Sequence, residues 1–109
     1  MATSSIDSRV PWPISSRRRF ARPESASAHY NLGTALTLAR KLDEAVHEYQ
    51  RAIAIDPGYA NAHNNLGNVF LAQKKYDEAI REFTEVVRLQ PDSAAALKNL
   101  AAAKALAKR

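Results

Sequence analysis

Asn31, Asn65 and Asn99 recur along the chain at a constant 34-residue spacing. An asparagine amide carries N–H donors and a carbonyl acceptor, so a row of such amides can bind both polar groups of an extended peptide backbone without selecting its side chains. Further polar residues are expected on or near the same surface, namely Asn61, Asn64, Asn68 and Lys98. The alternative interpretation is that each asparagine bonds to a neighbouring turn within the protein, because buried polar groups are normally hydrogen-bonded.

A basic cluster near the N-terminus is a second candidate site, formed by Arg17, Arg18, Arg19 and Arg22 with Phe20 among them. Such a cluster could contact the phosphates of nucleic acid or an anionic membrane surface. The alternative is a solvated segment that only adds charge. Residues 1–25 hold five arginines and two acidic residues, so much of the formal net charge of +5 is concentrated there.

The three histidines invite a metal or catalytic interpretation, which their positions do not favour. His29 and His63 are separated by the same interval as the asparagines, and equivalent positions on adjacent packed helices are roughly 10 Å apart, too far for one metal ion to bridge. A role in packing is expected for both, whereas His47 is expected to be solvated beside Asp43 and Glu44. The chain has no cysteine, no recognisable nucleophile–histidine–acid motif and no phosphate-binding glycine loop. We therefore expect a protein that is not an enzyme and needs no cofactor or metal.

These residues belong to a 34-residue internal repeat that begins at Ala26. Three kinds of landmark recur at this period, namely Gly33 with Gly67, Ala45 with Ala79, and Pro57 with Pro91. Apolar residues within each unit recur at helical spacing, which predicts two helices per unit. The units are residues 26–59 and 60–93, and one further helix is predicted over residues 94–109.

The repeat landmarks have physical explanations. A glycine inside a helix costs about 1 kcal/mol relative to alanine, so Gly33 and Gly67 are expected where the second helix of the same unit crosses closely, with Ala45 and Ala79 as its small partners. The larger side chains that should fill the space between successive hairpins are Tyr49, Phe83, Leu42 and Tyr76.

The ends of the second helices are also predicted. Asp43 and Asp77 stand where a side-chain oxygen can accept from free amides at a helix start. Pro57 and Pro91 disfavour a helical conformation at the residue before them, which ends the second helix of each unit.

The small, large and closing residues of the two units resemble the signature of the tetratricopeptide repeat. The matching residues are Leu32, Gly33, Ala45, Tyr49, Ala52 and Pro57, with Leu66, Gly67, Tyr76, Ala79, Phe83 and Pro91. The resemblance implies an all-α fold, a right-handed superhelical stack of antiparallel helix hairpins with about five helices. Residues 94–109 are similar to the first helix of a third repeat, although Ala101 replaces the glycine, and are predicted to cap the stack.

In this family the first helices line a concave groove that typically receives an extended peptide or a helix, and the asparagine row resembles that of O-GlcNAc transferases. Some members instead bind the C-terminal carboxylate of chaperones through lysine, arginine and asparagine. At those places this chain has Tyr30, Thr34, Ala95 and Asn99, and only Asn65 agrees. The resemblance therefore does not extend to chaperone-tail binding.

The leading functional hypothesis is a noncatalytic interaction module or scaffold that binds a partner peptide or helix in the groove. The alternative is a self-associating adaptor whose basic arm contacts nucleic acid, a membrane or targeting machinery. A third possibility is a fragment or an idealised repeat without a selected partner. Two repeats and a cap are fewer than the three usually needed, so a homo-oligomer, a partner or the arm folded across the first hairpin is expected to complete the core.

Residues 1–25 are expected to form an extended or disordered arm, because they are rich in serine, proline and arginine. Lysines and arginines interrupt every apolar stretch, so no membrane span is expected. The predicted location is cytoplasmic, or organellar if the arm is a transit peptide.

Overall fold

The structure is a computed structural model that describes residues 25–108. Within this range it contains helices and turns and no strand. The helices are α3 (Ala26–Leu38), α4 (Leu42–Ile55), α5 (Ala60–Ala72), α6 (Tyr76–Leu89) and α7 (Ala94–Ala107). The all-α prediction is confirmed, whereas the predicted arm lies outside the described residues apart from Ser25.

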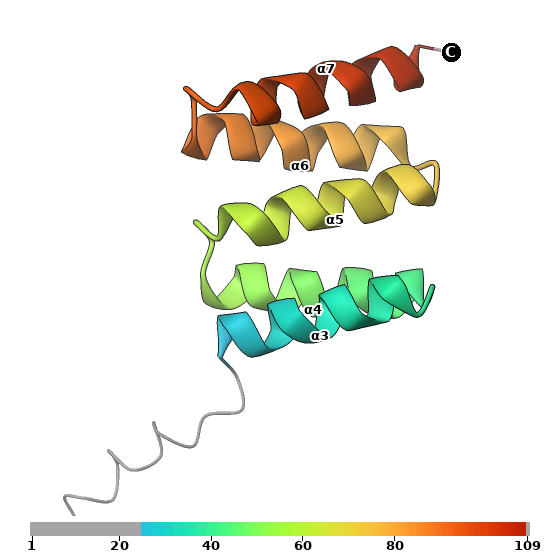
Figure 1. Cartoon of the computed structure of the whole chain (residues 1–109), viewed down its shortest axis with the longest axis vertical. Helices are drawn as coiled ribbons and strands as arrows, with labels where there is room; N and C mark the ends of the chain where they lie inside the picture. The colour runs from blue at the N-terminus through green and yellow to red at the C-terminus, as the bar shows by residue number, and fades with distance from the viewer. Residues whose placement is uncertain (1–24, 109) are drawn as a thin grey trace, which may run out of the picture.

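The five described helices are stacked one after another in chain order, and each runs antiparallel to the next (Figure 1). Helices α3 and α4 form the first hairpin, and α5 and α6 form the second. Helix α5 packs against α4, which joins the two hairpins, and α7 packs against α6. Each element therefore contacts mainly its neighbours in the chain, as in other repeat architectures.

Serine side chains start the first helix of the stack and the last. The Oγ atom of Ser25 accepts from the N–H of Ala28 at 3.0 Å, and that of Ser93 accepts from the N–H of Ala96 at 3.1 Å. Each bond satisfies one of the free amides that every helix start leaves.

The prediction that Asp43 and Asp77 cap their helices is wrong. Helices α4 and α6 begin after Lys41 and Lys75, and neither start has a side-chain cap bond. The two aspartates lie inside the first turn, where a carboxylate interacts favourably with the positive end of the helix dipole.

The tight turn before each of these helices contains one residue with a left-handed backbone conformation. The φ angle is 64° at Arg40 and 63° at Lys74. The N–H of Lys41 donates to the carbonyl of Leu36 at 2.9 Å, and the second hairpin has the equivalent bond. This pattern ends a helix with one residue in the left-handed region, a position usually given to glycine.

The prolines end the second helices as predicted. Helix α4 ends at Ile55, two residues before Pro57, and α6 ends at Leu89, two residues before Pro91. A proline restrains the residue before it to extended conformations, and the helices stop just ahead of that residue.

Both repeat glycines face a buried aromatic ring on the second helix of the same hairpin. A Cβ atom on Gly33 would lie 2.8 Å from Cε1 of Tyr49, and one on Gly67 would lie 2.7 Å from Cε1 of Phe83. Both rings are buried in the core. The close approach was predicted correctly, but its partner was not.

Ala45 and Ala79, the expected small partners, are fully buried, yet the atoms nearest the glycines belong to the rings. The physical reason is reach. Tyr49 and Phe83 stand one helical turn after these alanines on the same face, and their longer side chains extend to the helix opposite.

Candidate functional site

Four asparagines form a stripe along α5. Asn61, Asn64, Asn65 and Asn68 are spaced at i, i+3, i+4 and i+7, which places them on one side of the helix. Asn61 and Asn68 are exposed, whereas Asn64 and Asn65 are half-buried. We call this group the asparagine stripe.

The asparagine stripe borders two hollows. A hollow of about 160 Å³ lies between α5 and α7, and Asn61, Asn64 and Asn99 are among its lining residues. Another, of about 180 Å³, lies between α3 and α5 and is lined by Thr34, Thr37, Leu38, Tyr49, Asn65 and Asn68. The stripe is thus a ridge of amides between two recesses that lie between first helices, with Val86 of α6 lining one and Tyr49 of α4 lining the other.

Two of the three asparagines of the 34-residue row are hydrogen-bonded between adjacent first helices. Nδ2 of Asn65 donates to Oη of Tyr30 at 3.0 Å, and Nδ2 of Asn99 donates to Oδ1 of Asn64 at 3.0 Å. In each case the bond reaches back to the preceding repeat unit. These donors act within the stack, as the alternative interpretation has it, while Asn31 is exposed on α3.

Three tyrosines cluster beside α3, on the side of the stack that carries the asparagine stripe. The rings of Tyr30 and Tyr59 stack with centroids 5.0 Å apart, and Tyr30 tilts against Tyr49 at 5.8 Å. Burial, together with Tyr30 and Asp56 nearby, raises the pKa of Tyr59 above its ordinary value. From the sequence, Tyr30 is only a departure from the carboxylate-binding pattern and is not predicted as a site residue. Its position is equivalent to those of Asn64 and Lys98 in the repeat, which would have placed it on the same surface.

Among the first helices that line this side of the stack, α3 and α5 carry no charged side chain unless a histidine is protonated. Neither α3 nor α5 contains a lysine, arginine, aspartate or glutamate. Lys98 is exposed on α7 and provides a positive charge at that end of the stack. The polar groups that α3 and α5 present are therefore amides, hydroxyls and aromatic or imidazole rings.

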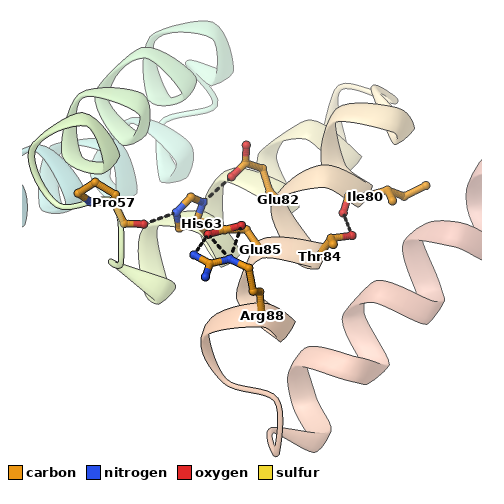
Figure 2. A network of polar contacts seen from close by, with 7 residues as sticks. All are labelled: Pro57, His63, Ile80, Glu82, Thr84, Glu85 and Arg88. Atoms are coloured by element: carbon orange, nitrogen blue, oxygen red, sulfur yellow. Dashed lines mark hydrogen bonds and ion pairs between the residues drawn. The ribbon is translucent and has the colours of Figure 1, made fainter.

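The histidines pair with glutamates inside their own hairpins. Nδ1–H of His29 donates to Oε1 of Glu48 at 2.6 Å, and Nδ1–H of His63 donates to Oε1 of Glu82 at 2.7 Å. Figure 2 shows the second pair, in which Nε2–H of His63 also donates to the carbonyl of Pro57 at 2.9 Å. Residues 25–108 contain no group of three or more histidine, cysteine, aspartate or glutamate side chains placed to hold a metal ion.

These pairs give both histidines the packing role that the sequence favoured. Sequence reasoning missed the glutamates, although the signal was present, since each repeat unit has a histidine and a glutamate at the same two positions. His47 is exposed, with Nη1 of Arg51 3.5 Å from its Nε2.

An exposed ion pair lies beside His63 (Figure 2). Nε of Arg88 donates to Oε1 and Oε2 of Glu85 at 3.1 and 3.0 Å. The hydrogen bond from Arg88 is the main cause that lowers the pKa of Glu85. Exposed pairs of this kind contribute little to stability.

The basic cluster Arg17, Arg18, Arg19 and Arg22 lies outside the described residues. Nucleic-acid, membrane or targeting contacts of the arm therefore stay predictions. Among residues 25–108, no helix combines the length and the apolar character that crossing a membrane requires.

Comparison with known families supports the interpretation of the repeat. Residues 60–93, which span α5 and α6, match the tetratricopeptide repeat family, and residues 40–74 match a second model described as a TPR repeat. The chain is a tetratricopeptide repeat protein. Tetratricopeptide repeats are protein-interaction modules. No curated protein gives a significant match over the sequence.

Solved structures share the fold. A crystal structure of MamA is 31% identical with a TM-score of 0.71, covering 73% of this chain and 47% of that one. A crystal structure of MamA protein is 29% identical with a TM-score of 0.75, covering 78% and 46%. This tetratricopeptide repeat chain thus spans about half the length of the MamA chains.

A third structure is the first TPR of Spaghetti (RPAP3), bound to the HSP90 peptide SRMEEVD. It is 22% identical with a TM-score of 0.76, and the match covers 82% of this chain and 71% of that one. At this identity the likeness shows the fold alone. The resemblance to O-GlcNAc transferases is not among these matches and stays a prediction.

Proposed function

We propose that this tetratricopeptide repeat protein binds an extended, largely uncharged segment of a partner protein across the asparagine stripe. The observation that carries the proposal is that the stripe borders both hollows between the first helices. A segment crossing it would meet exposed amides on the ridge and could place side chains in the recess on either side.

The hydrogen-bonding capacity of the stripe fits a peptide backbone. The exposed amides of Asn61 and Asn68 can donate to a backbone carbonyl and accept from a backbone N–H. Asn65 and Asn99 use their nitrogen atoms within the stack, which leaves their carbonyl oxygens to act as acceptors. The half-buried asparagines would thus position the ridge, while the exposed ones would make most of the new bonds.

The charge of the face argues for the class of ligand. A strongly acidic tail would need cations to compensate the loss of its hydration, and neither α3 nor α5 supplies a lysine or arginine. A neutral polar segment with small apolar side chains matches the amides and the half-buried ring of Tyr30. Lys98 would accept one acidic group at the α7 end.

The test begins with peptides selected from a displayed random library by the purified protein, each then measured by calorimetry. The variant Asn61→Ala with Asn68→Ala removes two exposed amides and should preserve the fold. Each lost hydrogen bond is worth about 0.5 to 1.5 kcal/mol, so the loss of two should raise the dissociation constant by about fivefold to a hundredfold.

The matched control is Gln50→Ala, which removes an exposed amide from α4 and should leave affinity unchanged. Equal affinity for the double variant and the native chain would refute the proposal. A library that yields only acidic peptides, with affinity dependent on Lys98 alone, would also refute it.

A further inference from the structure

The outer side of α3 exposes apolar residues that are buried at equivalent positions of α5. Leu32 is 48% exposed, whereas its equivalent Leu66 is 1% exposed. Ala28 and Ala35 are also exposed, but their equivalents are buried, at 0% for Ala62 and 2% for Val69. Helix α5 has α4 before it, whereas no helix precedes α3 among the described residues. Position in the stack, and not residue type, leaves this side of α3 uncovered.

A hollow of about 400 Å³ opens beside the uncovered side, between α3 and α4. Its apolar residues are Leu32 and Leu36, and the polar ones are Asp43, Glu44, His47 and Glu48. Three carboxylates line this hollow and no lysine or arginine does. We call it the acidic end groove. Its chemistry fits a segment with an apolar side chain flanked by cations.

A buried nitrogen of His29 indicates where such a segment would pass on its way into α3. Nε2 of His29 is buried and has no hydrogen-bond partner among the residues that the structure describes. The equivalent atom of His63 donates to the carbonyl of Pro57, in the turn that leads from α4 into α5. Pro23 occupies the position one repeat period before Pro57, so the repeat offers His29 the same partner one unit earlier.

We propose that residues 17–22 of the same chain occupy the acidic end groove. Their sequence is Arg17, Arg18, Arg19, Phe20, Ala21 and Arg22. Phe20 packs on Leu32 and Leu36, and the arginines face the carboxylates. The carbonyl of Pro23 accepts from Nε2 of His29, which sets the path of the chain into α3.

The distances allow this arrangement. An extended chain spans about 3.3 Å per residue, so Phe20 can reach about 17 Å from Ser25, where α3 begins. A helix rises about 1.5 Å per residue, which places Leu32 only about 10 Å along α3. Because the segment is tethered next to the groove, its effective concentration is in the millimolar range, which favours it over a second copy at ordinary protein concentrations.

The consequence is that the basic arm takes, beside α3, the place that α4 takes beside α5. It covers the apolar side of α3, neutralises the acidic end groove and occupies the arginines that could otherwise contact phosphates. This inference does not depend on the proposed peptide site, which lies on the asparagine stripe.

Disulfide formation tests the contact directly, since the chain has no cysteine. The test variant carries Ala21→Cys with Leu32→Cys, and the matched control carries Ala21→Cys with Asn31→Cys. Both target positions are exposed, but Asn31 lies about 100° around the helix. A docked arm should form the internal disulfide about tenfold faster with position 32, whereas a free arm reaches both positions equally. Adding Glu44→Lys should abolish the preference, and Glu78→Lys, its repeat equivalent, should not.

A second measurement leaves the groove intact, in case Leu32→Cys itself weakens docking. Replacing Arg17, Arg18 and Arg19 with serine in the full chain should shift the backbone amide NMR signals of Leu36 and Glu44, and leave those of Phe70 and Glu78 in place. If the disulfide shows no preference, this measurement decides, and unchanged signals overturn the proposal. Disulfide-linked dimers as the main product at position 32 would assign the groove to a second copy and would also overturn it.

Discussion

His63 and Glu82 join the two helices of the second hairpin, with Nδ1–H of His63 donating to Oε1 of Glu82 over 2.7 Å. The histidine stands on α5 and the glutamate on α6. His29 and Glu48 repeat the arrangement between α3 and α4. A hydrogen bond to a charged partner at a largely buried site is stronger than an exposed pair, so the repeat uses this contact as an internal brace between its helices.

We predict that His63 and Glu82 are energetically coupled. In a double-mutant cycle of His63→Ala and Glu82→Ala, the two losses of unfolding free energy should add up to about 1 to 2 kcal/mol more than the loss in the double variant. Urea denaturation with similar m-values checks this result. The control pairs His63→Ala with Glu78→Ala, one turn earlier on α6, and should show no coupling. Additive losses for His63 and Glu82 would contradict the brace.

A second prediction concerns the glycine under the Phe83 ring. A Cβ atom on Gly67 would lie 2.7 Å from this ring, which is fully buried and cannot swing into solvent. We expect Gly67→Ala to lower the unfolding free energy by about 1 to 3 kcal/mol through overpacking, despite the better helix propensity of alanine. Thermal and urea denaturation measure the loss.

Gly58 provides the control for this prediction. The atoms nearest to a Cβ there are 3.8 and 4.0 Å away, so Gly58→Ala should be close to neutral. A Gly67→Ala variant as stable as the native chain would mean that the Phe83 ring moves more freely than its burial indicates.

The hairpins themselves could be predicted from the sequence, whereas the starts of α4 and α6 could not. The period and the two prolines locate the helices because proline acts on the residue directly before it. An aspartate, in contrast, is favourable both as an N-cap and inside the first turn. The left-handed turns at Arg40 and Lys74 decide between these positions, and nothing in an arginine or a lysine predicts a positive φ.

The candidate site shows a similar limit. The 34-residue spacing predicts that Asn31, Asn65 and Asn99 occupy equivalent positions, but the partners of their amides depend on how closely successive first helices approach. Leu32 and Leu66 are the same residue at the same repeat position, yet they are 48% and 1% exposed. Only the order of packing in the stack distinguishes them.

A third prediction follows from the left-handed turns. Arg40 and Lys74 have φ angles of 64° and 63°, which cost free energy for residues with a Cβ atom. We expect relief of this strain in Arg40→Gly and in Lys74→Gly to raise the unfolding free energy by about 0.5 to 1 kcal/mol in each case. The greater entropy that glycine gives the unfolded chain reduces this gain. Lys41→Gly is the control, because its φ of −95° gives glycine no advantage. Destabilisation by all three changes would show that the turns carry no strain.

The last prediction concerns Tyr59 at high pH. Burial, then the neighbouring Tyr30 and Asp56, raise its pKa, since each disfavours the phenolate. In the unfolded chain the same group ionises near its ordinary pKa, about 10. The neutral Tyr59 therefore contributes stability that is fully present below about pH 10 and is lost as the pH rises through its higher folded pKa.

NMR titration of labelled tyrosine rings should show Tyr59 ionising above its ordinary pKa, and Asp56→Asn should lower that pKa because it removes one of the neighbouring charges. The unfolding free energy should fall less steeply above about pH 10 in Tyr59→Phe, because the ionisation of this residue no longer contributes to the fall. Tyr76→Phe is the control for removing a tyrosine hydroxyl outside the Tyr30, Tyr49 and Tyr59 cluster. If Tyr59 ionises at or below its ordinary pKa, the stacked rings of Tyr30 and Tyr59 are open to water, and the start of α5 next to the asparagine stripe is more hydrated than its contacts imply.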